Sequence, residues 1–288
     1  MAEKSVVLTI ENVEKAIAAF ESIDPNDEFA YEKAVLTYLT IKFLPIFIVD
    51  IPADTPLFRS RTHERDTLFE QISEISLAPN KVVSNFARCN RPFQSKFYCS
   101  ENRPTSYMEL VESWVDTKKV GDKVCVTISE WLLKSSLPFI IVTSPDKEKR
   151  ASKFDQIHGK IIDTFIDRHT GETREANIIF YRYLFEKFRK SAKKDLKTYI
   201  ITSAYCNVSL HLAGDKASGV YYPSIPFKEQ GVNFCINSKF VTKEHLELVS
   251  VARNEFMVEE NEIGKFNFQE TEFRQSKGLD LIGGTIKW

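Results

Sequence analysis

An arginine, a tyrosine and a glutamate that suit a nucleotide-cleaving site lie within residues 86–110, FARCNRPFQSKFYCSENRPTSYMEL. Arg88 precedes Tyr98 by ten residues, and Glu109 follows Tyr98 by eleven. A guanidinium can hold two oxygens of a pyrophosphate at once, and an aromatic ring packs against nicotinamide or adenine. A carboxylate stabilises the oxocarbenium-like state through which an N-glycosidic bond breaks. The residue types therefore indicate a site for a dinucleotide.

The order of these residues resembles the core of a known family. Residues 88–92, RCNRP, have the form R-x-N-x-P, residues 98–100, YCS, have the form Y-x-S, and Glu109 follows on a predicted helix. This order resembles RES-domain proteins, a family named for its Arg, Glu and Ser. Glu112 lies three residues further on the same helical face and is a rival for the glutamate. We prefer Glu109 because its distance from Tyr98 along the chain fits the spacing in the family.

Two further segments extend the resemblance to residues 57 to about 260. Ser224 follows a proline, and residues 233–237, NFCIN, supply the N-x-x-x-N strand that comes after the family's serine. Upstream, LFRSR offers Arg59 as the first-strand arginine, with Arg61 as the competing choice. Residues 84–87, SNFA, stand where RES proteins usually have glycines.

The resemblance implies roles for individual residues. Arg88 would hold the phosphates or the nicotinamide ribose, Glu109 would stabilise the cationic ribose, and Ser224 would hydrogen-bond the ribose or the nicotinamide amide. The implied NAD-binding residues are Arg59, Arg61, Asn90 and Tyr98, of which Tyr98 would stack against a ring.

The resemblance also implies a fold and an activity. RES domains are similar in fold to ADP-ribosyltransferase toxins, and the toxins among them consume NAD. The implied function is cleavage of the nicotinamide–ribose bond by water or phosphate, with NAD as substrate and a protein antitoxin as partner. One alternative is mono-ADP-ribosyl transfer to a protein. Another is a nucleotide-binding or interaction module without turnover, which the missing glycines favour.

Composition limits the class of protein. The chain has 288 residues, of which 43% are hydrophobic and 27% charged, so it can bury a large core without metals or disulfides. Its formal net charge of -1 argues against a protein that coats nucleic acid. The sequence indicates no particular oligomeric state.

Cysteine, histidine and apolar residues show no pattern of a metal site or a membrane span. The five cysteines contain no CxxC pair, and the five histidines have no ligand spacing, so we expect reduced thiols, no metal and a cytoplasmic location. No secretory leader is predicted. The longest apolar run, residues 43–49, is interrupted by Pro45 and is far shorter than the roughly 20 residues of a membrane helix.

Periodicity predicts an α+β fold in which the proposed residues are brought together by a mixed, twisted sheet. Helices are expected at residues 10–20, 27–42, 66–76, 106–114 and 176–192, and strands at 46–52, 56–61, 123–129 and 137–144. Residues 145–175 are expected to form a surface excursion, and the chain from residue 197 to be mostly strand. These elements predict a helical extension at 1–50 and one further domain at 51–288. The resemblance implies that this domain is an NAD-binding catalytic domain, with the sheet split around an ADP-ribosyltransferase-like cleft.

Overall fold

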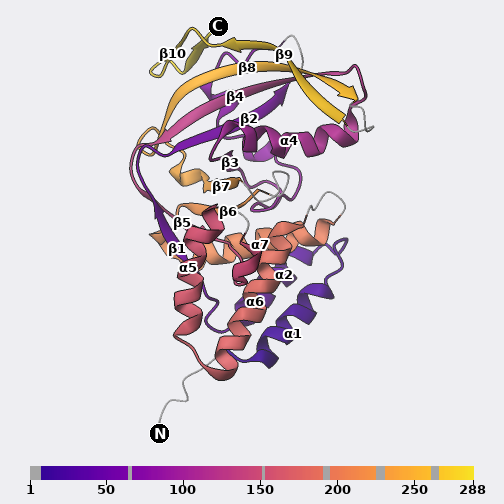
Figure 1. Cartoon of the computed structure of the whole chain (residues 1–288), viewed down its shortest axis with the longest axis vertical. Coiled ribbons are helices and arrows are strands. Elements are labelled where there is room, and N and C mark those ends of the chain that lie inside the picture. Colours follow the sequence, from indigo (N-terminus) through magenta and orange to yellow (C-terminus); the bar gives the residue numbers. More distant parts are fainter. Residues whose placement is uncertain (1–7, 64–66, 151–152, 191–194, 225–230, 261–265) are drawn as a thin grey trace.

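The computed structural model describes the chain except for residues 1–7, 64–66, 151–152, 191–194, 225–230 and 261–265. The described part is an α+β fold with seven α-helices, a large mixed sheet and a small two-stranded sheet. Figure 1 shows α1, α2, α5, α6 and α7 gathered below strands β1, β5 and β6, whereas α4 lies apart from them, beside β2 and β4.

The two N-terminal helices are α1 (Ile10–Glu21) and α2 (Ala30–Thr40), as their apolar spacing predicts. The Thr9 side chain caps α1 by accepting a hydrogen bond from the backbone nitrogen of Asn12 at 3.2 Å. Ala34 and Tyr38 of α2 are buried, whereas Leu39 is exposed, as is Phe43 beyond the end of the helix. The buried side chains of both helices belong to the same core as the sheet.

Three longer helices complete this layer: α5 (Lys153–Asp167), α6 (Gly171–Arg189) and α7 (Leu196–Leu212). The expected surface excursion at 145–175 is wrong, since α5 buries Phe154, Ile162 and Ile166. The strand expected from residue 197 is also wrong, because residues 196–212 form α7.

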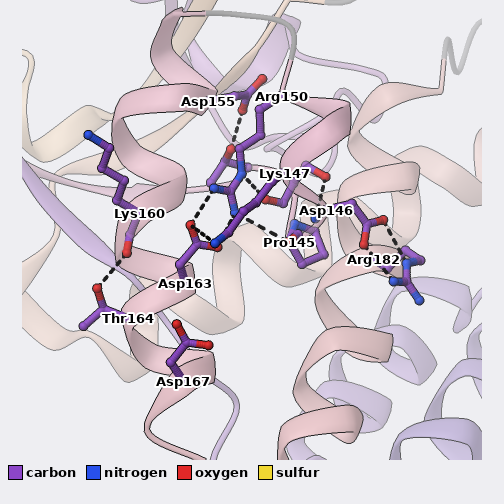
Figure 2. Close-up of polar contacts among 12 residues, drawn as sticks. Pro145, Asp146, Lys147, Arg150, Asp155, Lys160, Asp163, Thr164, Asp167 and Arg182 are labelled. Atoms are coloured by element: carbon purple, nitrogen blue, oxygen red, sulfur yellow. Dashed lines mark hydrogen bonds and ion pairs between the residues drawn. The ribbon is translucent and has the colours of Figure 1, made fainter.

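The loop that follows β5 is fastened to α5 by a charged cluster (Figure 2). Arg150 donates from Nη1 and Nη2 to the two carboxylate oxygens of Asp163, at 2.8 Å each, and its Nε donates to the Ser144 carbonyl at 3.0 Å. Gly159 makes room for the guanidinium, because a Cβ there would lie 2.4 Å from Arg150 Nε. The hydrogen bonds from Arg150 thus fix the C-terminal half of α5 relative to the loop that follows β5.

The large sheet has the strand order β1-β5-β6-β7-β3-β2-β4-β8-β9, in which only the β5–β6 pair is parallel. Its strands are β1 (Ile48–Ile51), β2 (Pro56–His63), β3 (Lys96–Ser100), β4 (Lys123–Leu133), β5 (Leu137–Ile141), β6 (Gly219–Pro223), β7 (Val232–Asn237), β8 (Leu246–Glu260) and β9 (Phe266–Gln275). The short strands β10 (Gly278–Asp280) and β11 (Thr285–Lys287) form the small sheet. The helix expected at 66–76 is reduced to α3 (Ile72–Ile75).

The large sheet is forked between β2 and β3. These neighbours share one register pair, Phe58 with Ser100, whereas β2 and β4 share eight pairs from Pro56–Leu132 to His63–Cys125. Helix α4 (Arg103–Thr117) packs against both β2 and β3 at this point. The fork therefore leaves a space that residues of β2, β3 and α4 can line.

Within the part of the chain that the structure describes, no helix combines the length and apolar character needed to cross a membrane.

Candidate functional site

A cavity of about 390 Å³ lies at the fork of the sheet. We call it the Glu109 cavity. It is lined by residues of β2, β3, α4, α7, β6 and β7 and of the loop before β3, namely Arg59, Ser60, Ala87, Arg88, Tyr98, Cys99, Ser100, Ser106, Glu109, Leu110, Ser113, Tyr199, Tyr222, Pro223 and Asn233. The cavity thus gathers segments that are far apart in the sequence.

Helix α4 carries the carboxylate of the cavity. The Asn102 side chain caps the helix by accepting from the Thr105 nitrogen at 2.8 Å. Lining positions 106, 109, 110 and 113 then recur at the helical spacing of three and four, so they share one face. The other face places Trp114 in a cluster with Val124 and Val258 of the sheet.

Glu109 is exposed at its helix surface, yet two donors fix one of its oxygens. The Ser224 hydroxyl donates to Glu109 Oε1 at 2.5 Å, and Asn233 Nδ2 donates to the same oxygen at 2.7 Å. The Ser100 hydroxyl donates to Asn233 Oδ1 at 2.7 Å, which sets the amide orientation. Oε2 of Glu109 has no protein partner among the described residues, so it is available to a ligand.

Strand register explains why these donors meet. Asn233 of β7 pairs directly with Tyr222 of β6 and with Ser100 of β3. Directly paired residues project from the same face of a sheet, so the three side chains form a row across the strands. Ser224 comes next after the last residue of β6, and its side chain is fully buried.

Arg59 lines the cavity from β2 and connects the two sides of the fork. Its Nη1 donates to the Tyr98 carbonyl at 2.7 Å, and its guanidinium lies 4.9 Å from the centre of the Phe97 ring. The Nε atom is buried without a hydrogen-bond partner among the described residues. Burial lowers the pKa of Arg59 to about 10, and nearby Arg61 adds to the shift. The guanidinium is still charged at neutral pH and retains unused donors.

Arg61 does not line the Glu109 cavity. Its Nη2 donates to the Ser76 carbonyl at 2.7 Å, on the segment that follows α3. Of the two arginines that compete for the first-strand position in the sequence, the structure thus brings Arg59 into the cavity.

Arg88 lines the cavity, but its guanidinium also holds the end of α6. Nη1 donates to the carbonyls of Phe188 at 2.7 Å and Lys187 at 3.3 Å, and Nη2 donates to the Lys190 carbonyl at 3.0 Å. A cation at a helix C-terminus is stabilised by the last carbonyls and the helix dipole. Arg88 is therefore engaged by the protein itself.

Tyr98 lines the cavity, and its hydroxyl takes part in two hydrogen bonds with the loop before β3. The hydroxyl donates to Asn90 Oδ1 at 2.8 Å and accepts from the Cys89 nitrogen at 2.9 Å. Burial raises the pKa of the Tyr98 phenol well above its ordinary value. Asn90 is buried and not part of the cavity wall, so the structure places it behind Tyr98, where it fixes the loop that carries Arg88.

Two further tyrosines line the cavity that the sequence analysis did not single out. Tyr199 of α7 and Tyr222 of β6 lie with their ring centres 5.7 and 6.0 Å from the Arg88 guanidinium. Tyr199 was missed because residues 196–212 were expected to be strand. Asn233 was noted only as part of a strand motif, and its bond to Glu109 depends on the register of β7.

The structure thus brings Arg59, Arg88, Tyr98 and Glu109 to one cavity, with Ser224 bonded to Glu109. It leaves Asn90 and Arg61 outside the wall. The Glu112 side chain, the rival carboxylate, lies outside the described part of the structure. Among the described residues, no group of three or more Cys, His, Asp or Glu side chains is arranged to hold a metal ion.

Comparisons with protein-family models, with curated proteins and with solved structures found no match to this chain.

Proposed function

We propose that this chain cleaves the N-glycosidic bond between nicotinamide and ribose in NAD. The observation that carries the proposal is the Glu109 carboxylate, held by Ser224 and Asn233 at a cavity that two arginines and three tyrosines also line. Glycosidic cleavage needs a fixed negative charge beside the anomeric carbon. The fork between β2 and β3 would then be the NAD cleft of an ADP-ribosyltransferase-like domain.

Glu109 would act on the cationic ribose. As the bond from C1′ to the nicotinamide nitrogen breaks, its electron pair leaves with the nicotinamide, which becomes neutral, and positive charge develops on the ribose. The donors on Oε1 keep the carboxylate in place, and Oε2 is available to face the ribose or to accept from one of its hydroxyls. An acceptor, water or phosphate, then bonds to C1′ and loses a proton.

Arg59 is better suited than Arg88 to hold the pyrophosphate. Among the described residues, the guanidinium of Arg59 donates only to the Tyr98 carbonyl, so most of its donors remain for phosphate oxygens. Arg88 donates to three carbonyls at the end of α6 and would mainly position the loop. Tyr98, Tyr199 and Tyr222 supply the ring faces for nicotinamide or adenine.

A binding module without turnover is the second candidate, because the engagement of Arg88 by α6 favours it. In that case NAD or a related nucleotide would bind the same cavity and leave unchanged. Transfer of ADP-ribose to a protein uses the same bond cleavage and differs only in the acceptor. An inhibitory protein partner would act by covering this cavity.

The test is incubation of the purified protein with NAD, with free nicotinamide followed by chromatography in the presence and absence of phosphate. Release of nicotinamide that is lost in Glu109→Gln supports cleavage, and labelled NAD that becomes attached to protein supports transfer. Binding by calorimetry without release supports the module. Neither binding nor release would exclude all three.

A further inference from the structure

A second cavity, of about 350 Å³, lies at the opposite end of β3 from Ser100. We call it the Lys96 cavity. Its polar lining residues are Gln94, Lys96, Asn207, His211, Asn237 and Lys239, and it shares no lining residue with the Glu109 cavity. Lys96 begins β3 and Ser100 ends it, so the two sites are separated by about 13 Å along the strand.

Lys96 is the unusual residue of this cavity. It is only 6% exposed, and its ammonium has no ion-pair or hydrogen-bond partner among the residues that the structure describes. The buried part of Lys96 is its alkyl stem, because the ammonium nitrogen is not among the buried atoms that lack a partner. The ammonium is therefore accessible from the cavity that Lys96 lines, without a counter-charge among the described residues.

The walls around Lys96 offer donors rather than carboxylates. Among the described lining residues, none carries a carboxylate, whereas Lys239 and His211 bring further nitrogen groups. Asn237 pairs with Lys96 across β7 and β3, so the two side chains lie on one face of the sheet. The side-chain nitrogen of Asn237 has no hydrogen-bond partner among the described residues, since this amide only accepts from Ser238 at 3.5 Å.

The remaining amides form a rigid wall. Gln94 Nε2 donates to Asn207 Oδ1 at 2.8 Å, and Asn207 Nδ2 donates back to Gln94 Oε1 at 3.1 Å. Asn207 also donates to the Ser203 carbonyl of α7 at 3.0 Å. Donors and walls that are already ordered bind a ligand without a further ordering cost.

An adjoining cavity of about 410 Å³ shares Gln94 and Asn237 with the Lys96 cavity. It is lined by Ser95, which is 6% exposed and whose buried hydroxyl has no hydrogen-bond partner in the described structure. Two successive residues, Ser95 and Lys96, thus bring unsatisfied polar groups to the same region.

We propose that the Lys96 cavity binds a small molecule through a phosphate group. Phosphate accepts several charge-assisted hydrogen bonds at once, which matches an ammonium without a counter-charge beside amide and imidazole groups, with the Ser95 hydroxyl in the adjoining cavity. The volume is at the lower end for small-molecule sites and suits a phosphate carried by a group of about the size of a sugar. The proposal is independent of the activity at the Glu109 cavity.

A purely structural explanation is that the Lys96 ammonium stabilises the C-terminal end of α7. Leu210 and His211, from the last turn of α7, line the cavity, and the helix dipole favours a cation there. The two explanations predict different results for Lys96→Met. Removal of an ammonium that only faces the cavity would preserve the stability of the free protein, whereas loss of a cation that stabilises the end of α7 would lower it.

The experiment is calorimetric titration of the full chain with inorganic phosphate, with ribose 5-phosphate and with ribose, at constant ionic strength. We expect both phosphates to bind and ribose alone not to bind, and we expect Lys96→Met to weaken phosphate binding by roughly tenfold or more. Stronger binding of ribose 5-phosphate than of inorganic phosphate would identify a phosphate monoester as the ligand. Lys96→Arg retains the charge and should retain binding.

Two control variants separate this site from its surroundings. Lys160→Met removes an exposed lysine of α5 and should bind phosphate as the wild type does. Arg59→Met alters the Glu109 cavity, so any phosphate binding lost in this variant belongs to that cavity, and the binding that is lost in Lys96→Met should remain. The proposal is overturned if neither phosphate binds the wild type, if Lys96→Met binds as well as wild type, or if only Arg59→Met abolishes binding.

Discussion

The Ser224 hydroxyl donates a 2.5 Å hydrogen bond to Oε1 of Glu109, which joins two residues 115 positions apart in the chain. Together with Asn233, Ser224 fixes one oxygen of the carboxylate and leaves the other without a protein partner among the described residues. An isolated surface glutamate would have no such support. The geometry makes Glu109 the residue on which the proposed activity depends.

Glu109→Gln should lower the rate of nicotinamide release by about 10²-fold or more, because it removes the charge that stabilises the ribose cation while keeping the size of the side chain. The rate is measured with saturating NAD. Glu112→Gln is the matched control and should retain activity. Equal losses in both variants, or an active Glu109→Gln, would contradict the assignment.

Ser224→Ala should lower the same rate by roughly tenfold, since one hydrogen bond to the carboxylate is lost while Asn233 still holds Oε1. The Ser224→Ala, Asn233→Ala double variant should approach the loss seen in Glu109→Gln, because both donors act on the same oxygen. Unaltered kinetics in the double variant would show that the orientation of Glu109 is irrelevant to turnover.

Arg88→Lys should destabilise the fold by about 1–3 kcal/mol, because a lysine cannot reproduce the fork that donates to three carbonyls at the end of α6. The free energy of unfolding is measured in urea. Arg168→Lys changes an exposed arginine and should have no measurable effect. If Arg88→Lys unfolds like the wild type, Arg88 is free to bind a ligand and its helix contacts carry little energy.

Gly159→Ala should be destabilising by about 1–3 kcal/mol, although alanine normally favours a helix over glycine. The added Cβ would lie 2.4 Å from Arg150 Nε and would displace the guanidinium that binds Asp163. Gly278→Ala is the control, because its Cβ meets no atom within 4 Å. Thermal unfolding of both variants gives the comparison, and a more stable Gly159→Ala would refute the crowding.

The ion pair between Asp163 and Arg150 should make the free energy of unfolding depend on pH in the acidic range. Hydrogen bonding to Arg150 lowers the pKa of Asp163 below its ordinary value of about 3.9, so folding favours the carboxylate form. This stabilisation is present above pH 4 and is lost as the pH falls through the lowered pKa. The difference in unfolding free energy between wild type and Asp163→Asn should therefore shrink between pH 5 and pH 2. A difference that is constant with pH would disprove the linkage.

The residues of the candidate site could be proposed from the sequence because their chemistry is local. A guanidinium, a ring and a carboxylate can be recognised by type, and the order of motifs placed Ser224 with them. Their surroundings depend on tertiary structure. That Arg88 would meet the carbonyls of Phe188 and Lys190, and Asn233 would meet Glu109, follows from packing that no spacing reveals.

The helices also differ in whether the sequence predicts them. Helix α1 was predicted because Val13, Phe20 and their neighbours form one apolar stripe on a helix with a polar face. Helix α7 was mistaken for strand because it is buried on nearly all sides and rich in Ile and Thr, which favour strands and give no helical period.

Lys187 shows that the surroundings of a charged residue also depend on tertiary structure. Lys187 stands close to Arg189 and Lys190, and such a run of basic residues on a helix is ordinarily a solvated face. The structure buries it to 6% exposure and pairs it with Glu21 of α1 at 2.7 Å. The partner lies far away in the sequence, so charge patterning within the helix could not identify it.

Because β2 and β3 share a single register pair, the site residues also help to hold the two halves of the large sheet together. Arg59 bridges from β2 to the backbone of β3, Ser60 bonds Ser106 of α4 at 2.7 Å, and Glu109 of α4 bonds Ser224 beyond β6. These side-chain hydrogen bonds connect β2 and β3 where backbone hydrogen bonds between the two strands are few. A ligand bound among these side chains would stabilise the junction between the two halves of the sheet. Amide hydrogen exchange in β2 and β3 would therefore become slower when the ligand binds.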